Sequence, residues 1–441
     1  MSATLKRAFA LLILLGVVWV IYLTVCLRPD ASSKSAPTAH SCEAPEPVSS
    51  GLSALANPPD WSLLEIYQNT ITRGEFESLL TTVFTTGNAW QAFIEINDTE
   101  ARIKTGPKLT DPSFHLHFAE AEARIPRHWR AATALPPATP ERPLGGLKIA
   151  LDPGHIGGEW AKMEERWFVV AEGTPVCEGD MTLLVANLLK PRLEALGAVV
   201  SLVRENSEPV TKVRPVDLQA LALDSSPPND SPTARQRLAE RLFYRTAEIR
   251  ARADLVNHTL KPDLVLCLHF NAEAWGDPNN PTLIDRTHLH LLLNGAYTDE
   301  EVGLADQRFA LLQKLLQRTH REEALVGATI AGAFAEISHL PPYIYSPESS
   351  NVRPTPGQPY LWIRNLLANR LYECPVIFME PYVMNSTTDY ARIQAGDYAG
   401  LRDIGGAMLP SIFREYADAV TAGLARHYSL ARHPTQRPTD R

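Results

Sequence analysis

Cysteine is scarce in this sequence, and its five cysteines form no metal-finger spacing. An odd number does not describe a disulfide framework, although one bridge stays possible if the chain is exported to an oxidising compartment. Cys267 and Cys374 lie within apolar runs and are expected to be buried free thiols. A hydrophobic share of 45% with 21% charged residues is an ordinary globular balance, and the length of 441 residues allows two globular parts plus extra segments.

An excess of positive charge is also missing. Lysine and arginine number 42 against 50 aspartates and glutamates, which gives a formal net charge of -8. Because binding to nucleic acid depends mainly on clustered Lys and Arg, a nucleic-acid partner is not expected. The sequence contains no internal repeat.

One long uncharged and mostly apolar run stands near the N-terminus. Lys6 and Arg7 precede residues 8–27, and this run has the length that a helix needs to cross a bilayer. Basic residues before such a run place the N-terminus in the cytoplasm and the rest of the chain outside. We therefore expect residues 1–30 to form an uncleaved signal anchor, a single transmembrane helix. A cleaved signal peptide and a lipoprotein acceptor at Cys26 are the alternatives.

The next part of the chain divides into a linker, a small domain and a second linker. Residues 31–60 are rich in Ala, Ser and Pro and are expected to be disordered. A small α+β domain is predicted for residues 61–130, with a helix at 73–83 and strands at 91–97, 101–105 and 114–118. His115 and His117 would share one face of the last strand, and a solvent-facing edge explains them better than a metal site. The proline-rich residues 131–146 form the second linker.

From residue 147 onward, apolar strands alternate with helices. This alternation predicts an α/β domain over 147–430, with a mostly parallel sheet and helices on both faces, followed by a disordered tail at 431–441. The expected strands cover residues 147–151, 198–203, 264–270, 288–293 and 375–379. The expected helices cover residues 180–196, 232–260, 299–340 and 410–428.

Three polar residues stand where expected strands of this sheet end. His155 lies just past the first strand, and His269 and Glu380 end two later ones. In open α/β sheets ligands gather at the carboxyl ends of the strands. A single histidine in such a place is usually a hydrogen-bonded core residue. Two histidines with a carboxylate favour a metal site, because a buried charge without a partner is costly.

Five segments around these residues occur in an order that resembles a known family. They are residues 148–155, Glu178 with 179–183, 200–205, 252–257 followed by 263–271, and 374–380. Together they resemble the zinc-dependent N-acetylmuramoyl-L-alanine amidases, the catalytic domains of cell-separation and sporulation hydrolases. The resemblance extends over about residues 147–428.

The resemblance implies a function and a site. It implies hydrolysis of the amide between the lactyl group of muramic acid and L-alanine in peptidoglycan, with Zn²⁺ as the cofactor. It assigns zinc to His155, Glu178 and His269, and proton transfer to Glu380. The expected location is the bacterial cell membrane, with the N-terminal helix in the inner membrane and the catalytic domain in the periplasm or outside the cell. An activating protein partner is not readable from the sequence.

The residues make chemical sense without the family. Two imidazoles and one carboxylate leave a zinc ion with an open position for water, which is the ligand set of a hydrolytic site. Zinc lowers the pKa of bound water to about 7 and polarises a carbonyl group. Glu380 would then take a proton from water and pass it to the leaving amine.

Other interpretations of these residues remain open at this point. Glu178 begins an expected helix, where a carboxylate also stabilises the helix dipole. Cys267 shares a strand face with His269 and could be a ligand, whereas His288 and His290 are most simply one face of a strand. Other carboxylates could compete for the ligand role of Glu178, and these are Glu159, Glu164, Glu165 and Glu172.

The sequence also departs from the family pattern. Ile156 separates His155 from the glycines that usually follow it, and the loop 159–177 is long. The aromatic residues of this loop could stack on substrate, pack in the core or form a lid, and these are Trp160, Trp167 and Phe168. A zinc hydrolase that cuts another wall amide and an inactive wall-binding protein are therefore the alternative functions.

Overall fold

The computed structural model describes residues 51–108, 110–121 and 123–432. The predicted membrane helix at 8–27 lies outside the described residues, as do most of the predicted linker at 31–60 and most of the predicted tail at 431–441. Within the described residues, no helix combines the length and the apolar character that a membrane span requires.

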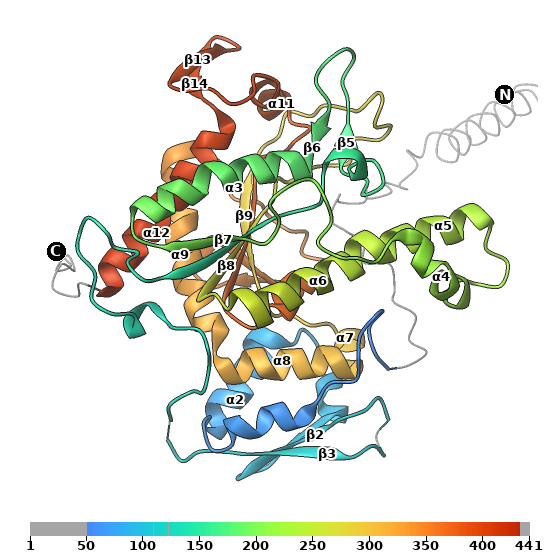
Figure 1. The fold of residues 1–441 in the computed structure, drawn as a ribbon. Helices are drawn as coiled ribbons and strands as arrows, with labels where there is room; N and C mark the ends of the chain where they lie inside the picture. The colour runs from blue at the N-terminus through green and yellow to red at the C-terminus, as the bar shows by residue number, and fades with distance from the viewer. Residues whose placement is uncertain (1–50, 109, 122, 433–441) are drawn as a thin grey trace, which may run out of the picture. The chain divides into compact units, whose positions relative to one another are not determined.

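A seven-stranded sheet forms the centre of the molecule, as the alternation of strands and helices predicts (Figure 1). Its strand order is β10-β11-β9-β12-β8-β4-β7. Four of the six neighbouring pairs are parallel, including the run β12-β8-β4-β7 that carries the predicted site. The mixed α/β fold with a mostly parallel sheet is therefore confirmed. The strands are β4 (Lys148–Pro153), β7 (Val199–Leu202), β8 (Leu264–Leu268), β9 (Leu289–Leu293), β10 (Val352–Thr355), β11 (Gln358–Arg364) and β12 (Val376–Pro381).

Strand β9 runs against its neighbour β12. It pairs with β12 in antiparallel register and with β11 in parallel register. The amino end of β9 therefore meets the carboxyl ends of β12, β8 and β4. This places the segment around His288 and His290 at the edge of the sheet where the predicted site lies.

Helices cover both faces of the sheet, and the strand residues alternate between them. Ile149 and Leu266 point into a cluster with α3, α9 and α12, whereas Ala150 and Val265 point into a cluster with residues of α6 and α10. Successive strand side chains face opposite sides, so both buried faces require the apolar runs seen in the sequence. The helices on the first face are α3 (Glu178–Ala195), α9 (Thr319–Ser338) and α12 (Ile412–Arg432), and those on the second are α6 (Glu248–Asp254) and α10 (Leu367–Leu371).

The remaining helices agree with the predicted ranges in part. The helix expected at 232–260 is a continuous helical segment made of α5 (Pro232–Arg241), η7 (Leu242–Ala247), α6 and η8 (Leu255–Leu260). The range 299–340 contains α7 (Asp299–Gly303), α8 (Ala305–Gln317) and α9. Several elements were not expected. Two of them are strands of the central sheet, β10 and β11, and a third is the short helix α10. The others are α4 (Gln219–Ser225), α11 (Thr387–Gln394) and the two-stranded pairs β5 (Trp167–Phe168) with β6 (Val176–Cys177) and β13 (Leu401–Ile404) with β14 (Ala407–Pro410).

The segment before the α/β region has the predicted α+β composition. It contains α2 (Arg73–Leu79) and an antiparallel sheet of β1 (Ile94–Ile96), β2 (Glu100–Lys104) and β3 (Ser113–His117). His115 and His117 are exposed on β3, which agrees with a solvent-facing edge. The shorter helical turns of this segment are η1 (Trp61–Tyr67), η2 (Leu80–Phe84) and η3 (Ala89–Ala92).

This segment shares its hydrophobic core with the rest of the molecule. Leu64 and Phe76 are fully buried in one cluster with Tyr297, Leu311 and Leu315 of the later chain. Helix α8 therefore forms part of the wall of this core, and in Figure 1 it lies beside α2.

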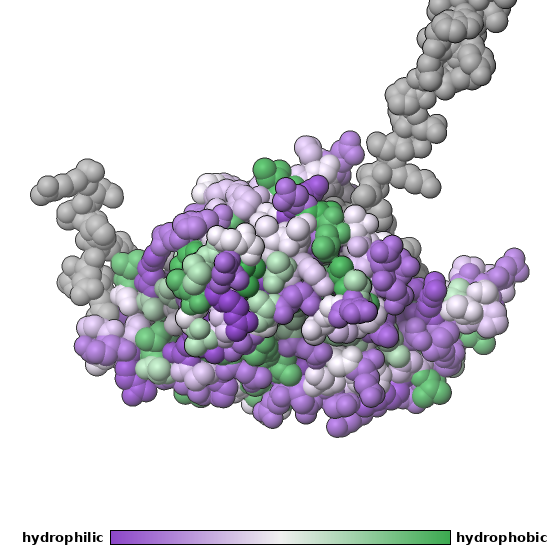
Figure 2. All heavy atoms as spheres, turned by 90° about the horizontal axis from the view of Figure 1, so that it is seen from above, coloured by the Kyte–Doolittle hydropathy of each residue, from purple (hydrophilic) through white to green (hydrophobic). Residues whose placement is uncertain are grey.

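Residues expected to lie in linkers also have defined contacts. The Ser53 amide donates to Asp306 Oδ1 at 2.8 Å, and Leu135 and Leu144 are buried in the core of the α/β region. The face seen from above is mostly hydrophilic with separate hydrophobic patches (Figure 2). Scattered exposed apolar residues of this kind are ordinary on the surface of a folded protein.

Candidate metal centre

His155 lies in the turn that follows β4, and its backbone is fixed from several sides. Its φ angle is 58°, a left-handed conformation that is uncommon for a non-glycine residue. The buried Arg252 guanidinium donates to the carbonyl oxygens of Pro153 and His155, each at 2.7 Å, and to Asp152 Oδ1 at 2.8 Å. Thr182 donates to the Gly154 carbonyl at 2.7 Å. These bonds hold the turn in the conformation that directs the imidazole into the site.

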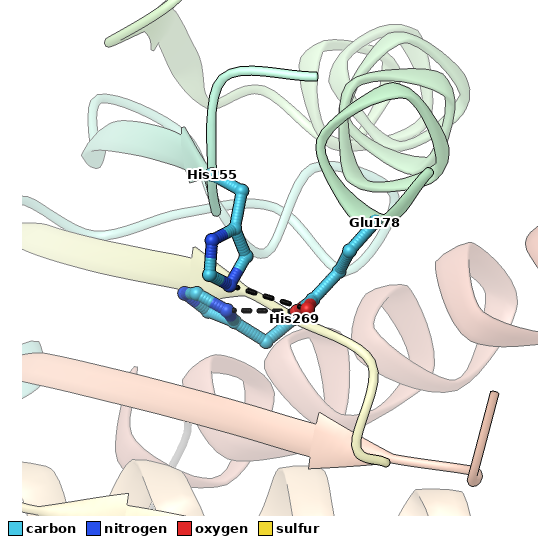
Figure 3. A group of neighbouring side chains, drawn as sticks. All are labelled: His155, Glu178 and His269. Carbon is cyan, nitrogen blue, oxygen red and sulfur yellow. Dashed lines mark hydrogen bonds and ion pairs between the residues drawn. The ribbon is translucent and has the colours of Figure 1, made fainter. Parts of the chain in front are cut away.

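Glu178 is the first residue of α3 and is almost fully buried. Its Oε2 lies 3.2 Å from His155 Nε2, and its Oε1 lies 3.1 Å from His269 Nδ1 (Figure 3). Oε1 also accepts the Phe270 amide at 3.2 Å. The carboxylate thus faces the two imidazoles, so stabilising the helix dipole is not its whole role.

His269 directly follows β8, and its ring stacks on Phe378 with a centroid distance of 4.2 Å. The turn after β4 passes close to this ring. A Cβ atom added at Gly154 would lie 2.2 Å from His269 Cε1, so only glycine fits there. The glycine of the Asp-Pro-Gly-His segment therefore has a steric role: it lets the two histidines approach each other.

These three side chains form a cluster with the composition of a metal site. One potential ligand atom from each of His155, Glu178 and His269 lies within 4.8 Å of the others. In the part of the chain that the structure describes, no second group of three or more His, Cys, Asp or Glu side chains is arranged closely enough for an ion. The structure therefore brings together the three residues that the sequence singled out as ligands.

Glu164 is a buried carboxylate behind His155. Its Oε1 lies 3.6 Å from His155 Nδ1, and its two oxygens accept the amides of Ile156 and Gly157 at 2.9 to 3.1 Å. A carboxylate on the second ring nitrogen orients a metal-binding histidine and fixes its tautomer. Sequence reasoning considered Glu164 only as a rival ligand. Its spacing from His155 gave no signal of this supporting role, because the loop between them has no periodic pattern.

The charges of the cluster perturb one another. Burial lowers the pKa of His155, but Glu178 and Glu164 outweigh this effect and raise it to about 8. Burial raises the pKa of Glu178, but the two histidines outweigh that and hold it well below its usual range. Burial lowers the pKa of His269. Glu178 is therefore ionised at neutral pH, as a metal ligand must be.

Glu380 lies on β12, beside the strand that leads to His269. Met379 is opposite Leu268 in the parallel pair, and the His269 amide donates to the Met379 carbonyl at 3.1 Å. Burial and the neighbouring Glu178 carboxylate raise the pKa of Glu380 to about 8. Glu380 is not one of the three clustered ligands.

The rival residues have other surroundings. Cys267 lies with its Sγ 3.8 Å from Asp152 Oδ2, and burial raises its thiol pKa well above the usual value, so it is a buried thiol as expected. Cys374 is also buried and free. The other carboxylates of the loop are exposed on the surface, namely Glu159, Glu165 and Glu172.

The aromatic residues of the long loop separate into two roles. Phe168 is fully buried in the core, and Trp160 packs on Phe243 with a centroid distance of 5.2 Å. Trp167 is partly exposed and lines a cavity.

His288 and His290 are both buried at the amino end of β9, with ring centroids 6.0 Å apart.

Comparison with known proteins gives distant structural likeness. No model of a protein family matches the chain, and no curated protein matches it. Solved structures similar to it include several N-acetylmuramoyl-L-alanine amidases. One is Ami1 from Mycobacterium smegmatis, with a TM-score of 0.36 and 16% identity over 65% of this chain and 98% of that chain. Another is Ami1 from Mycobacterium abscessus, with a TM-score of 0.36 and 16% identity over 64% of this chain and 99% of that chain. A third is CwlD from Clostridioides difficile, solved in complex with the GerS lipoprotein. Its TM-score is 0.35, with 12% identity over 65% of this chain and 100% of that chain.

Proposed function

We propose that this chain is a zinc-dependent N-acetylmuramoyl-L-alanine amidase, which hydrolyses the amide between the lactyl group of muramic acid and L-alanine in peptidoglycan. The observation that carries the proposal is the convergence of His155, Glu178 and His269 at one edge of the sheet, with ligand atoms within 4.8 Å of one another. The choice of peptidoglycan follows from the resemblance of the sequence motifs to that family.

The residues present fit a zinc ion. Two imidazoles and one ionised carboxylate are the ligand types of a catalytic zinc site, and three protein ligands leave a position for water or substrate. Glu164 supplies the outer carboxylate that such a histidine ligand usually has. Zinc bound there supplies a Lewis acid that polarises the scissile carbonyl and makes water easier to deprotonate.

Glu380 is the proposed proton carrier. Its carboxyl group is half-buried, and this burial together with the nearby Glu178 carboxylate raises its pKa to about 8. A nearby cation favours the carboxylate form. The side chain can then accept a proton from the attacking water and deliver it to the leaving nitrogen of L-alanine, which allows the amide to break.

The remaining residues orient the reacting groups. Arg252 and Thr182 hold the turn that presents His155, and Phe378 supports the ring of His269. Arg166 lies with its Nε 3.4 Å from Glu178 Oε2. This positive charge helps to keep the Glu178 carboxylate ionised in the buried site.

Product analysis tests the proposal. The full chain with one equivalent of zinc is incubated with purified peptidoglycan, and the products are separated and identified. Free lactyl groups on the sugar strands together with intact stem peptides would support the amidase. New ends within the stem peptides would favour the other zinc hydrolase, and absence of any product with zinc bound would favour the wall-binding protein.

We further propose that the chain is held in the bacterial cell membrane by a single helix, with the α/β region in the periplasm or outside the cell. The support is the apolar run at 8–27 after Lys6 and Arg7. Cell fractionation of the full chain, followed by external protease, tests this. A mature form released into the soluble fraction would show instead that the run is a cleaved signal.

A further inference from the structure

A cavity of about 590 Å³ is formed by three segments of the chain. One wall is the long loop after His155, with Lys162, Met163 and Trp167. The second is α5, with Arg237 and Glu240, and the third is the loop after His269, which contributes Trp275. Two of the three walls are thus loops that lead directly from the histidines of the metal site.

The long loop connects this cavity to the metal site residue by residue. Glu164 and Arg166 face inward, where they contact His155 and Glu178. Their neighbours along the loop, including Met163 and Trp167, line the cavity instead. Trp167 is also paired with Cys177, the residue before Glu178, across the short ladder of β5 and β6. The same segment therefore contacts the metal-site residues with some of its side chains and lines the cavity with others.

Two cations of the cavity are available to an anionic group. Within residues 51–108, 110–121 and 123–432, neither Lys162 nor Arg237 lies within ion-pair distance of a carboxylate. Glu165, which also lines the cavity, lies 3.8 Å from Arg245 and is partly neutralised by it. Glu165 and Glu240 are the two carboxylates of the lining, so the lining is formally neutral. Lys162 and Arg237 nevertheless stay available to a carboxylate of a bound ligand, because neither is taken up by an ion pair among the described residues.

Two tryptophans supply the apolar surface. The Lys162 ammonium lies 4.3 Å from the centroid of the Trp167 ring, which places the cation at the aromatic surface. Trp275 packs against the buried Phe168 at 5.1 Å between centroids, so its position is fixed by the core. An elongated ligand with alkyl groups and an ionised carboxylate suits such a combination of aromatic rings and cations.

We propose that this cavity binds the stem peptide of the wall substrate, and that Lys162 and Arg237 recognise a free carboxylate of that peptide. The inference rests on the proposed amidase function. The peptide extends from the scissile amide, and the cavity is built from the loops that carry the metal site. Uncharged sugar rings would use the tryptophans but have no need for the two cations.

The test uses two matched muramoyl-peptides, one with a free C-terminal carboxylate and one with that carboxylate amidated. A charge-assisted hydrogen bond contributes about 1.5–3 kcal/mol, so each of Lys162→Met and Arg237→Met should lower kcat/KM for the free acid by about 10- to 100-fold. The loss should appear in KM, and cleavage of the amidated substrate should change little. Lys261→Met is the matched control, because this exposed lysine precedes the amino end of β8 at the other edge of the sheet.

A binding measurement separates this inference from the amidase proposal. Calorimetry of the full chain without added zinc, titrated with the free stem peptide in its acid and amide forms, needs no catalysis. Tighter binding of the acid form that is lost in Lys162→Met and Arg237→Met supports the subsite, even if the parent protein cleaves nothing. Equal binding of both forms, or equal loss of kcat/KM on both substrates, would overturn it.

Discussion

Glu380 on β12 lies directly opposite His290 on β9 in an antiparallel register. Directly opposite residues in such a pair point to the same face of the sheet. His290 is fully buried, and its Nε2 lies 3.2 Å from the Tyr345 hydroxyl oxygen. The side chains of Glu380 and His290 therefore lie next to each other on one face of the sheet, and the Tyr345 hydroxyl holds the His290 ring.

Replacement of this carboxylate tests the proton carrier. Glu380→Gln keeps the shape of the side chain but removes its basicity, so we expect zinc content close to that of the parent. Turnover should fall by about 10²- to 10⁴-fold, the contribution of general acid-base catalysis. Metal analysis and a wall-digestion assay measure the two quantities. The exposed Glu120→Gln is the control, and loss of zinc in Glu380→Gln would make Glu380 a ligand instead.

Removal of a metal ligand should reduce the zinc content as well as the turnover. His269→Ala leaves two of the three clustered side chains, so we expect a sharp loss of zinc together with loss of activity. The same result is expected for His155→Ala and Glu178→Ala. Full zinc occupancy in His269→Ala would exclude this ligand set.

Glu164, the carboxylate behind His155, should affect the affinity for zinc but not the number of zinc ions bound per chain. Glu164→Gln weakens the support of His155 Nδ1, and changes of this kind usually lower metal affinity by about 10- to 100-fold. Competition with a zinc chelator measures the dissociation constant. The exposed Glu159→Gln of the same loop should match the parent, and equal affinity of both variants would remove Glu164 from the site.

Zinc affinity should depend on pH in a defined direction. The carboxylates raise the pKa of His155 to about 8, so below that pH a zinc ion that binds must displace a proton. The dissociation constant should therefore increase about fivefold from pH 8 to 7 and about tenfold from pH 7 to 6. It should change less above pH 8, where His155 is already neutral. Titrations at constant ionic strength measure this, and a flat profile between pH 6 and 8 would contradict it.

The shared core predicts that the segment with α2 and the α/β region unfold together. Leu311→Ala removes a fully buried side chain from the cluster that contains Leu64 and Phe76, which should cost about 2–5 kcal/mol of the free energy of unfolding. The whole thermal transition should shift. Leu63→Ala is the control, because its side chain is 56% exposed. A separate early transition confined to the N-terminal segment would show that the two parts unfold independently.

The sequence predicted five of the seven strands of the sheet because their apolar runs are continuous. It did not predict β10 and β11, which lie in and after a proline-rich stretch and have no continuous buried run. Two buried faces require such runs, and the residues after them, His155, His269 and Glu380, were visible for the same reason. The direction of β9 was not predictable, because the residues of a buried strand are equally apolar in either direction. The opposition of His290 and Glu380 depends on that direction and could not be foreseen.

The supporting residues of the site were harder to find. Glu164 was indistinguishable from the exposed Glu159 and Glu165 of the same loop, because an irregular loop has no period from which burial can be read. The extent of the shared core was hidden for a different reason. Leu311 and Leu64 belong to elements that are far apart in the chain, and no local pattern records which apolar faces will meet.

The contact between Thr86 and Tyr297 joins residues that are 211 positions apart. A ribosome adds residues in order, so Leu64 and Phe76 are synthesised long before their core partners in α8. They cannot be buried in this shared core until α8 has been made. Only then can the first part of the chain become a finished structure.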